Sequence, residues 1–316
     1  MTNLKISGMV LSLSAAAVLL GSCGPRTSVK REQVMSAHET EKVKSKHTGP
    51  RRRIGVVDFE NKSGYGQGRL GSAASDVLIT ELAKTGKFVV VERDKLNKIF
   101  DEQKLQASGA IDSRTAVKIG RILGLSAIVT GSISESGVKK EGSDYLLVSS
   151  KKQIAEVVVD IRVVDVETGQ VIYADSGSGR AKASKRAVLG LGGRSGYDET
   201  LEGKALRAAI VQFTDNITSQ VNKKPWSCRI AAVRGKNLYL NAGITMGVEK
   251  GLKLDCFHLG GEIMDPTTGL VLGYEEVPLG RAEVVGPLGD SGEGAIAVLS
   301  GSAEGASKND ICRMAD

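Results

Sequence analysis

Residues 154–166 read Ile-Ala-Glu-Val-Val-Val-Asp-Ile-Arg-Val-Val-Asp-Val, which is the strongest β-strand signal in the chain. Alternate positions put β-branched residues on one face of such a strand and interrupt the other face with charge. The apolar face holds Val157, Val159, Ile161 and Val163, and the charged residues are Glu156, Asp160 and Arg162. Residues 167–170, Glu-Thr-Gly-Gln, are typical of a turn into a second apolar run at 171–174. We therefore predict an antiparallel hairpin.

Helical spacing appears on both sides of this hairpin. Apolar residues recur at helical intervals from Leu70 to Leu82, and Gly86 is typical of a helix C-terminus. Further helices are predicted near residues 96–100, 113–123 and 199–221, and shorter strands at 54–59, 88–92 and 127–133. This uneven mixture predicts the α+β class, with a mixed, mainly antiparallel sheet and flanking helices.

Pro225 and Trp226 mark a change in pattern. Beyond them, short apolar runs alternate with glycine turns, and helical periodicity is absent. This pattern predicts a small C-terminal all-β domain that resembles a barrel.

The N-terminus has the parts of a secretory signal peptide: Lys5, an apolar stretch at 9–20 and small residues after it. Residues 20–23, Leu-Gly-Ser-Cys, resemble a bacterial lipobox, which implies cleavage before Cys23 and its acylation, palmitate included. Several acyl chains anchor a protein firmly. Gly24 after the cysteine, by resemblance to lipoprotein sorting rules, favours the outer membrane. The alternative is an ordinary signal peptide followed by a chance cysteine.

The net charge of +7 is concentrated next to this signal. Residues 24–53 carry nine basic and three acidic side chains, whereas residues 54–316 are neutral overall. A basic face for nucleic acid is therefore not supported. Few large apolar residues lie between 24 and 50, so we expect a disordered tether that spans roughly 30 Å. Residues 51–53, Arg-Arg-Arg, either touch anionic lipid or form a solvated lead-in.

These patterns divide the chain into four parts. We expect a lipoprotein signal peptide at 1–22, a lipidated tether at 23–53, an α+β domain at 54–224 and an all-β domain at 225–316. Apart from Cys23, the cysteines are Cys228, Cys256 and Cys312, and an odd number in an oxidising compartment leaves one bridge at most. Cys228 and Cys312 lie near the two ends of the last segment, so we expect them to pair.

Four blocks together resemble the curli-secretion lipoprotein family, CsgG: residues 54–61, 88–93, 124–132 and 161–169. Their order and spacing match over residues 54–221. The resemblance implies a periplasm-facing outer-membrane lipoprotein that assembles as a ring and passes unfolded, amyloid-type subunits across the membrane. It implies two membrane hairpins at 137–154 and 176–197, and a constriction loop at 60–71 in which Tyr65, Gln67 and Arg69 line the opening or meet a partner.

The segments that correspond to the hairpins depart from this pattern. A lipid-facing strand needs about 9 to 11 residues with alternating apolar positions. Both segments are instead rich in lysine and arginine, so we interpret them as long, partly disordered hairpins that could insert only within a ring. The alternative function is a non-channel periplasmic lipoprotein, an adaptor or activator of envelope (cell-wall) enzymes, whose partners are other envelope proteins.

Residue patterns that carry chemistry are weak. Residues 66–71 form a literal G-x-G-x-x-G, but six residues separate the first glycine from the preceding strand, so a dinucleotide site is not favoured over a flexible loop. Cys256 and His258 could share a strand face, yet two ligands do not make a zinc site. We expect no catalytic residue, cofactor or metal, and no enzyme activity.

Overall fold

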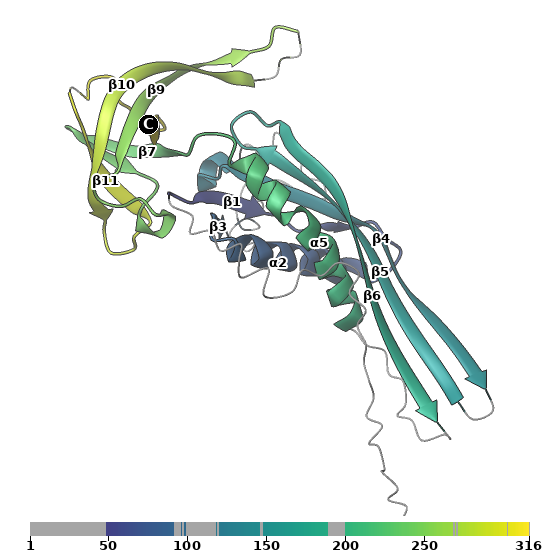
Figure 1. The fold of residues 1–316 in the computed structure, drawn as a ribbon. Helices are drawn as coiled ribbons and strands as arrows, with labels where there is room; N and C mark the ends of the chain where they lie inside the picture. The colour runs from purple at the N-terminus through teal and green to yellow at the C-terminus, as the bar shows by residue number, and fades with distance from the viewer. Residues whose placement is uncertain are drawn as a thin grey trace, which may run out of the picture.

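The computed structural model describes residues 49–91, 96, 98, 118, 120–145, 148–188, 200–267, 269, 271–301 and 303–315. Within these ranges a mixed sheet with helices is followed by a closed barrel (Figure 1). The predicted α+β class with a barrel-like C-terminal part is confirmed. Cys23 and the tether as far as residue 48 lie outside the described residues.

The first sheet has the strand order β3-β1-β4-β5-β6, with β2 attached to β4. The strands are β1 (Arg52–Val56), β2 (Glu60–Asn61), β3 (Phe88–Val91), β4 (Ala127–Tyr145), β5 (Val148–Asp165) and β6 (Val171–Val188). β1 pairs in parallel with β3 and β4, whereas β4, β5 and β6 are antiparallel. The hairpin predicted from residues 154–174 is therefore confirmed, and its strands are longer than expected.

Helices α2 (Gln67–Lys84) and α5 (Thr200–Val221) cover one face of this sheet. The predicted apolar face of β5 lies beneath them, with Phe213 and Leu78 among the fully buried side chains. A smaller buried cluster occupies the opposite face and includes Leu96, Ile128 and Val164. The sheet therefore has a helix layer on one side and a smaller apolar cluster on the other.

The close packing of α5 on β6 depends on two glycines. A Cβ atom on Gly179 would lie 1.8 Å from the carbonyl oxygen of Ala205, and one on Gly177 would lie 2.4 Å from that of Ala209. Both obstacles are backbone atoms of the helix, which cannot rotate away as a side chain can. The two glycines thus set the separation between α5 and the sheet.

The barrel has the strand order β10-β11-β8-β7-β12-β9, and every neighbouring pair is antiparallel. Its elements are β7 (Ser227–Arg234), β8 (Asn237–Leu240), the 3-10 helix η1 (Ile244–Met246), β9 (Lys253–Met264), β10 (Val271–Leu288), β11 (Gly294–Leu299) and β12 (Ile311–Met314). Closure leaves no open edge within the barrel. Buried side chains such as Leu240 and Leu254 fill its interior.

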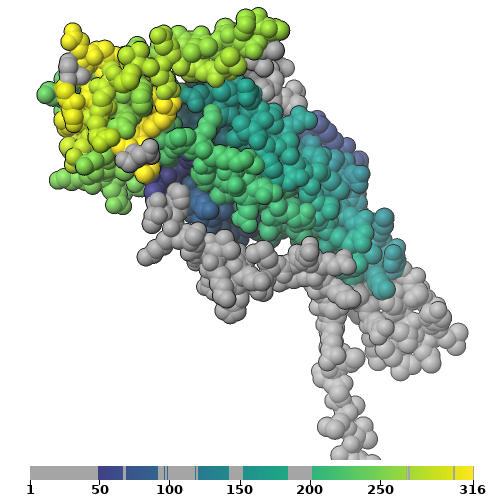
Figure 2. Space-filling view, turned by 45° about the horizontal axis from the view of Figure 1, so that its top comes forward, coloured from purple at the N-terminus to yellow at the C-terminus, as the bar shows by residue number. Residues whose placement is uncertain are grey.

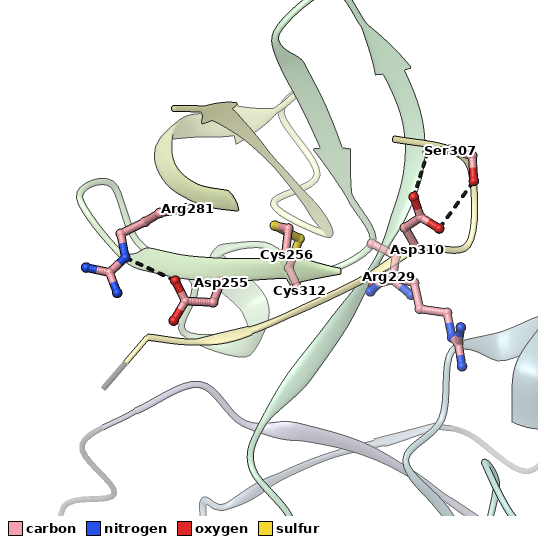
Figure 3. Close-up of a disulfide and its surroundings, with 8 residues drawn as sticks. Arg229, Asp255, Cys256, Arg281, Ser307, Asp310 and Cys312 are labelled. Atoms are coloured by element: carbon pink, nitrogen blue, oxygen red, sulfur yellow. Dashed lines mark hydrogen bonds and ion pairs between the residues drawn. A yellow bond between two sulfur atoms is a disulfide. The ribbon is translucent and has the colours of Figure 1, made fainter. Parts of the chain in front are cut away.

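The predicted Cys228–Cys312 disulfide is wrong. Cys312 bonds to Cys256 (Figure 3), and Cys228 is a buried free thiol. Position along the chain does not decide the pairing. Strand β12 pairs with both β7 and β9, which places a cysteine opposite Cys312 on each side.

Residues 51–53 fasten the barrel to the first sheet, a role that neither of the two expectations for them included. Arg51 donates its backbone N–H to the Met246 carbonyl, 2.6 Å away, and its own carbonyl accepts a hydrogen bond from the Trp226 indole at 3.1 Å. Arg53 forms an ion pair with Glu293 at 3.2 Å. The first residues of the described chain therefore bind the last domain.

Arg52 is the buried member of this junction, with 6% of its surface exposed. Its guanidinium donates to the side chain of Asn222 at 3.2 Å and to the carbonyl of Lys224, both just after α5. Burial lowers the pKa of Arg52, while the negative charge of Asp165 opposes that effect. Beyond this junction, the barrel and the distal ends of β4, β5 and β6 occupy opposite ends of the molecule (Figure 2).

Replacement of Gly179 by alanine should lower the free energy of unfolding by about 2–3 kcal/mol, because the new methyl group forces α5 away from the sheet. Urea denaturation followed by circular dichroism measures the change. Gly137→Ala is the matched control, since nothing lies within 4 Å of a Cβ at that position of the same sheet. Equal stability of the two variants would contradict this packing.

Arg52→Ala should cost about 2–4 kcal/mol, because it leaves the Lys224 carbonyl and the Asn222 side chain without their donor in a buried place. Limited proteolysis should also cut earlier near residues 222–226. Arg69→Ala, on an exposed site of α2, should change stability by no more than about 0.5 kcal/mol. If both variants behave like the parent chain, the junction does not depend on Arg52.

Candidate functional site

The far ends of β4, β5 and β6 are the most distinctive surface of the first domain. We call residues 137–145, 148–156 and 180–188 the distal sheet; they pair directly with one another in the antiparallel register. Ala205 of α5 packs on Gly179 of β6. Four residues of a helix rise about 6 Å, which equals about two residues of a strand. The first turn of α5 therefore lies near the level of Ala181. The three strands continue past it (Figure 1).

Two partly disordered hairpins were expected here; the antiparallel hairpin at 137–154 is present, and the described residues of both segments are paired strand rather than disordered. Residues 137–145 and 148–154 form the ends of β4 and β5, while residues 176–188 continue β6 along β5. The result is one continuous three-stranded sheet. Residues 189–197 of the second expected hairpin lie outside the described residues. The alternating pattern of 154–166 predicted a strand, but it could not show that the pairing extends to Tyr145 and Val188.

The face of the distal sheet away from α5 is strongly charged. Residues directly opposite each other in adjacent strands share a face. The register assigns eight described positions to this one, of which six are charged and only Ile154 is large and apolar: Gly137, Lys139, Glu141, Lys152, Ile154, Glu156, Arg180 and Lys182. Lys139 and Lys182 flank Ile154 on both sides. Among these eight positions, no apolar row runs along a strand.

An ion-pair network crosses all three strands on the same face. Glu156 of β5 lies 3.5 Å from Lys139 of β4 and also pairs with Arg180 of β6. Burial raises the pKa of Glu156, but the hydrogen bond and charge of Arg180, together with Lys139, outweigh it and hold that pKa below its usual value. Glu156 is thus ionised at neutral pH, and the network ties the strands together.

The opposite face of the distal sheet is small and mixed. Val138, Ala155 and Ala181 lie side by side where α5 begins, and the next row holds Lys140 and Ala183 with Gln153 between them. Ala155 and Ala181 are buried, whereas Lys140 is exposed. This face therefore loses its apolar character within two residues of the helix end.

The expected constriction loop, residues 60–71, is divided between three environments. Tyr65 is half-buried against the main core, and burial together with its hydrogen bond to Glu202 raises its pKa. Gln67 begins α2, and Arg69 is exposed in the first turn of that helix. In the single chain Tyr65 is therefore partly covered by the core, whereas Arg69 is exposed.

Two of the three glycines at 66–71 have structural roles. Gly66 adopts a left-handed conformation with φ of 78° at the start of α2, and a Cβ on Gly71 would lie 2.0 Å from the Phe59 carbonyl oxygen. Close packing of α2 against the chain that leaves β1 therefore requires glycine at 71. The first and last glycines of the literal dinucleotide pattern thus have structural roles.

His258, Asp310 and Ser307 meet in the barrel, but their geometry is not that of a catalytic triad. The Asp310 carboxylate lies 2.9 Å from the Nδ1 atom of His258, and the Ser307 hydroxyl lies 3.4 Å from that same nitrogen. A triad places the hydroxyl and the carboxylate on different ring nitrogens. Asp310 instead accepts backbone N–H groups of Leu259 and Ser307, so it holds the turn before β12.

Metal ligands and membrane helices are not found within the described ranges. No group of three or more His, Cys, Asp or Glu residues there could hold a metal ion, and Cys256 is engaged in its disulfide. No helix among the described residues is both long and apolar enough to cross a membrane.

A second contact between the two domains was not expected from the sequence. Strands β9 and β10 extend past the barrel as a two-stranded arm (Figure 1). Arg121 lies 3.6 Å from Glu262 of this arm, and its guanidinium carbon lies 5.5 Å from the centre of the Tyr274 ring. The arm is thereby fixed against the first domain, and its far end exposes Ile263, Met264 and Leu272.

Comparison with known proteins gives a family match that includes the whole first domain. The model of the family "Curli production assembly/transport component CsgG" matches residues 33–242, so most of the barrel lies beyond the match. A presumed lipoprotein of Neisseria meningitidis serogroup B is 33% identical over 236 residues, which cover 71% of this chain and 98% of that protein. The curli component CsgG of Escherichia coli K12 is 23% identical over 264 residues, covering 77% and 90%.

The similarity to solved structures is weaker. The crystal structure of lipoprotein GNA1162 from Neisseria meningitidis has a TM-score of 0.33 and 18% identity, and covers 55% of this chain and 99% of that one. A similarity of this size carries no argument about function. The family model, in contrast, matches about two thirds of the chain, and on that ground the chain belongs to the curli production assembly/transport component CsgG family.

Proposed function

We propose that this chain is an outer-membrane lipoprotein that faces the periplasm and serves as a non-channel adaptor or activator of an envelope protein, with the distal sheet as its contact surface. Acylated Cys23 would attach it to outer-membrane lipid; that residue lies outside the described ranges, and the lipobox pattern supports its role. Family membership supports an envelope lipoprotein of the curli type.

The observation that carries this proposal is the charge on the distal sheet. A strand in contact with lipid alternates apolar residues outward, and each lysine or arginine at the bilayer centre costs about 2–4 kcal/mol. The face away from α5 has six charged positions among eight, and the other face carries Lys140 and Gln153. Where the side chains are described, neither face offers a lipid-facing row, and both suit an aqueous compartment.

The same charges favour a partner with an acidic surface. Among residues of the distal sheet whose side chains are described, five are cationic and two are anionic: Lys139, Lys140, Lys152, Arg180 and Lys182, against Glu141 and Glu156. Complementary charge speeds association and selects among partners. The ion pairs of Glu156 with Lys139 and Arg180 link all three strands across this surface.

A ring that carries unfolded subunits across the outer membrane is the second candidate. Strand length favours it, because β4, β5 and β6 contain 19, 18 and 18 residues and the distal parts match the 9 to 11 residues of a membrane strand. In such a ring Tyr65, Gln67 and Arg69 would lie at the opening of the pore. Assembly would have to supply the apolar surface that one chain lacks.

Planar-bilayer recording separates the two candidates. We expect the purified, lipidated protein, in its native oligomeric state, to give no stable unitary current, because the described positions of the distal sheet are too charged to lie against lipid. A porin added afterwards to the same bilayer serves as the positive control. Reproducible unitary steps before that addition would contradict the adaptor proposal and favour the channel.

Photo-crosslinking in intact cells tests the contact surface. A benzophenone amino acid at Glu141, exposed on the distal sheet, should give a discrete protein adduct, and the same probe at Lys236 in the barrel should not. Combined Lys152→Glu and Lys182→Glu substitutions should reduce the adduct roughly tenfold by reversing the local charge. Lys236→Glu with Lys250→Glu is the matched control. An adduct insensitive to charge reversal would reject the proposed surface.

A further inference from the structure

Three cysteines of the barrel lie in a row across adjacent strands. Cys312 of β12 is directly opposite Cys256 of β9 on one side and directly opposite Cys228 of β7 on the other. Residues opposite each other in a sheet share a face. All three side chains are accordingly buried in the barrel interior, with no more than 5% of any residue exposed.

Cys312 is within bonding range of both neighbours. Its Cα atom lies 4.1 Å from that of Cys256, to which it is bonded. On the other side, Ile230 donates to Asp310 and Met314 donates to Trp226, so the intervening Cys228–Cys312 pair is also a hydrogen-bonded one. Such pairs have Cα atoms about 5.5 Å apart, which suits a disulfide.

Cys228 and Cys256 cannot pair with each other in the folded barrel. Strand β12 separates β7 from β9, which places them about 9–10 Å apart across two strand spacings. Disulfides need Cα atoms within about 7 Å. Cys312 is consequently the shared member of two alternative disulfides.

We propose that Cys228 is an exchange partner for Cys312, so that the barrel has two interconvertible disulfide forms. Cys228 loses its proton to solvent, and its thiolate attacks the Sγ atom of Cys312. The Cys228–Cys312 bond forms as the Cys256–Cys312 bond breaks, and Cys256 leaves as a thiolate that takes up a proton. One disulfide and one thiol are present before and after, so the step needs no oxidant or reductant.

Burial keeps this exchange slow in the closed barrel. The apolar interior raises the pKa of Cys228 to about 12, so at neutral pH the thiolate is roughly a thousandfold rarer than for an ordinary cysteine. Thiol exchange proceeds through the thiolate. The step therefore waits for local opening of the barrel, which hydrates Cys228 and restores its reactivity.

The exchange would alter the attachment of the arm. Strand β9 carries the arm that Arg121 holds against the first domain, and the Cys256–Cys312 bond ties β9 to β12. Transfer of the bond to Cys228 ties β12 to β7 instead, the strand that follows α5. The row of cysteines thus determines whether the root of the arm is covalently fixed to the barrel.

Disulfide mapping of the full chain tests the proposal. Cys256→Ala, oxidised in the bacterial envelope, should contain a Cys228–Cys312 disulfide in the tryptic map after alkylation under denaturing conditions. The Cys228→Ala variant is the matched control and should retain only Cys256–Cys312. Removing both Cys228 and Cys256 should lower Tm by roughly 10 °C relative to Cys256→Ala, because that chain has no bond to Cys312.

A folded Cys256→Ala protein in which Cys228 and Cys312 are both alkylated would overturn the proposal. If that variant does not fold, the parent chain is tested instead. Held at pH 8 in a urea concentration near the start of unfolding and then quenched with acid, it should contain the Cys228–Cys312 linkage, which is absent before treatment. Exclusive recovery of Cys256–Cys312 from that sample would also overturn it.

Discussion

The contact between α5 and the two glycines of β6 is the constraint on which the rest of the structure depends. With the backbone of the helix against Gly177 and Gly179, the C-terminus of α5 lies beside Arg52 at the start of β1. The residues after the helix then become the acceptors that Arg52 needs, and the chain enters the barrel at once. One close packing contact therefore fixes the domain junction and leaves the distal sheet uncovered by the helix.

Much of this fold could be predicted from local pattern. Alternation in residues 154–166, helical spacing in 70–82 and 199–221, and glycine-punctuated strands after Trp226 each correspond to an element that the structure contains. These signals work because burial of one face is dictated by residues two or four apart. The length of β4 and β6 was not predictable in this way, since their distal residues are paired by cross-strand ion pairs and backbone hydrogen bonds rather than by an apolar face.

Features that depend on strand order were the ones missed. Cys312 has cysteines on both sides only because β12 lies between β7 and β9, and chain position gives no information about that order. The arginines at 51–53 resembled a solvated or lipid-facing run until Asn222 and Glu293 were brought next to them from distant parts of the chain. For the candidate surface, the sequence supplied the lysines and arginines, and the register supplied the single face that they share.

The proposed function requires the distal sheet to remain in water, which an environment-sensitive fluorophore tests most directly. Lys152 is exposed on the face of the distal sheet away from α5, and Lys152→Cys accepts an NBD label while Cys228 stays buried. In lipidated protein bound to liposomes, we predict the same emission maximum as in protein released from lipid. A blue shift with loss of quenching by iodide would place these strands in the bilayer and contradict the account.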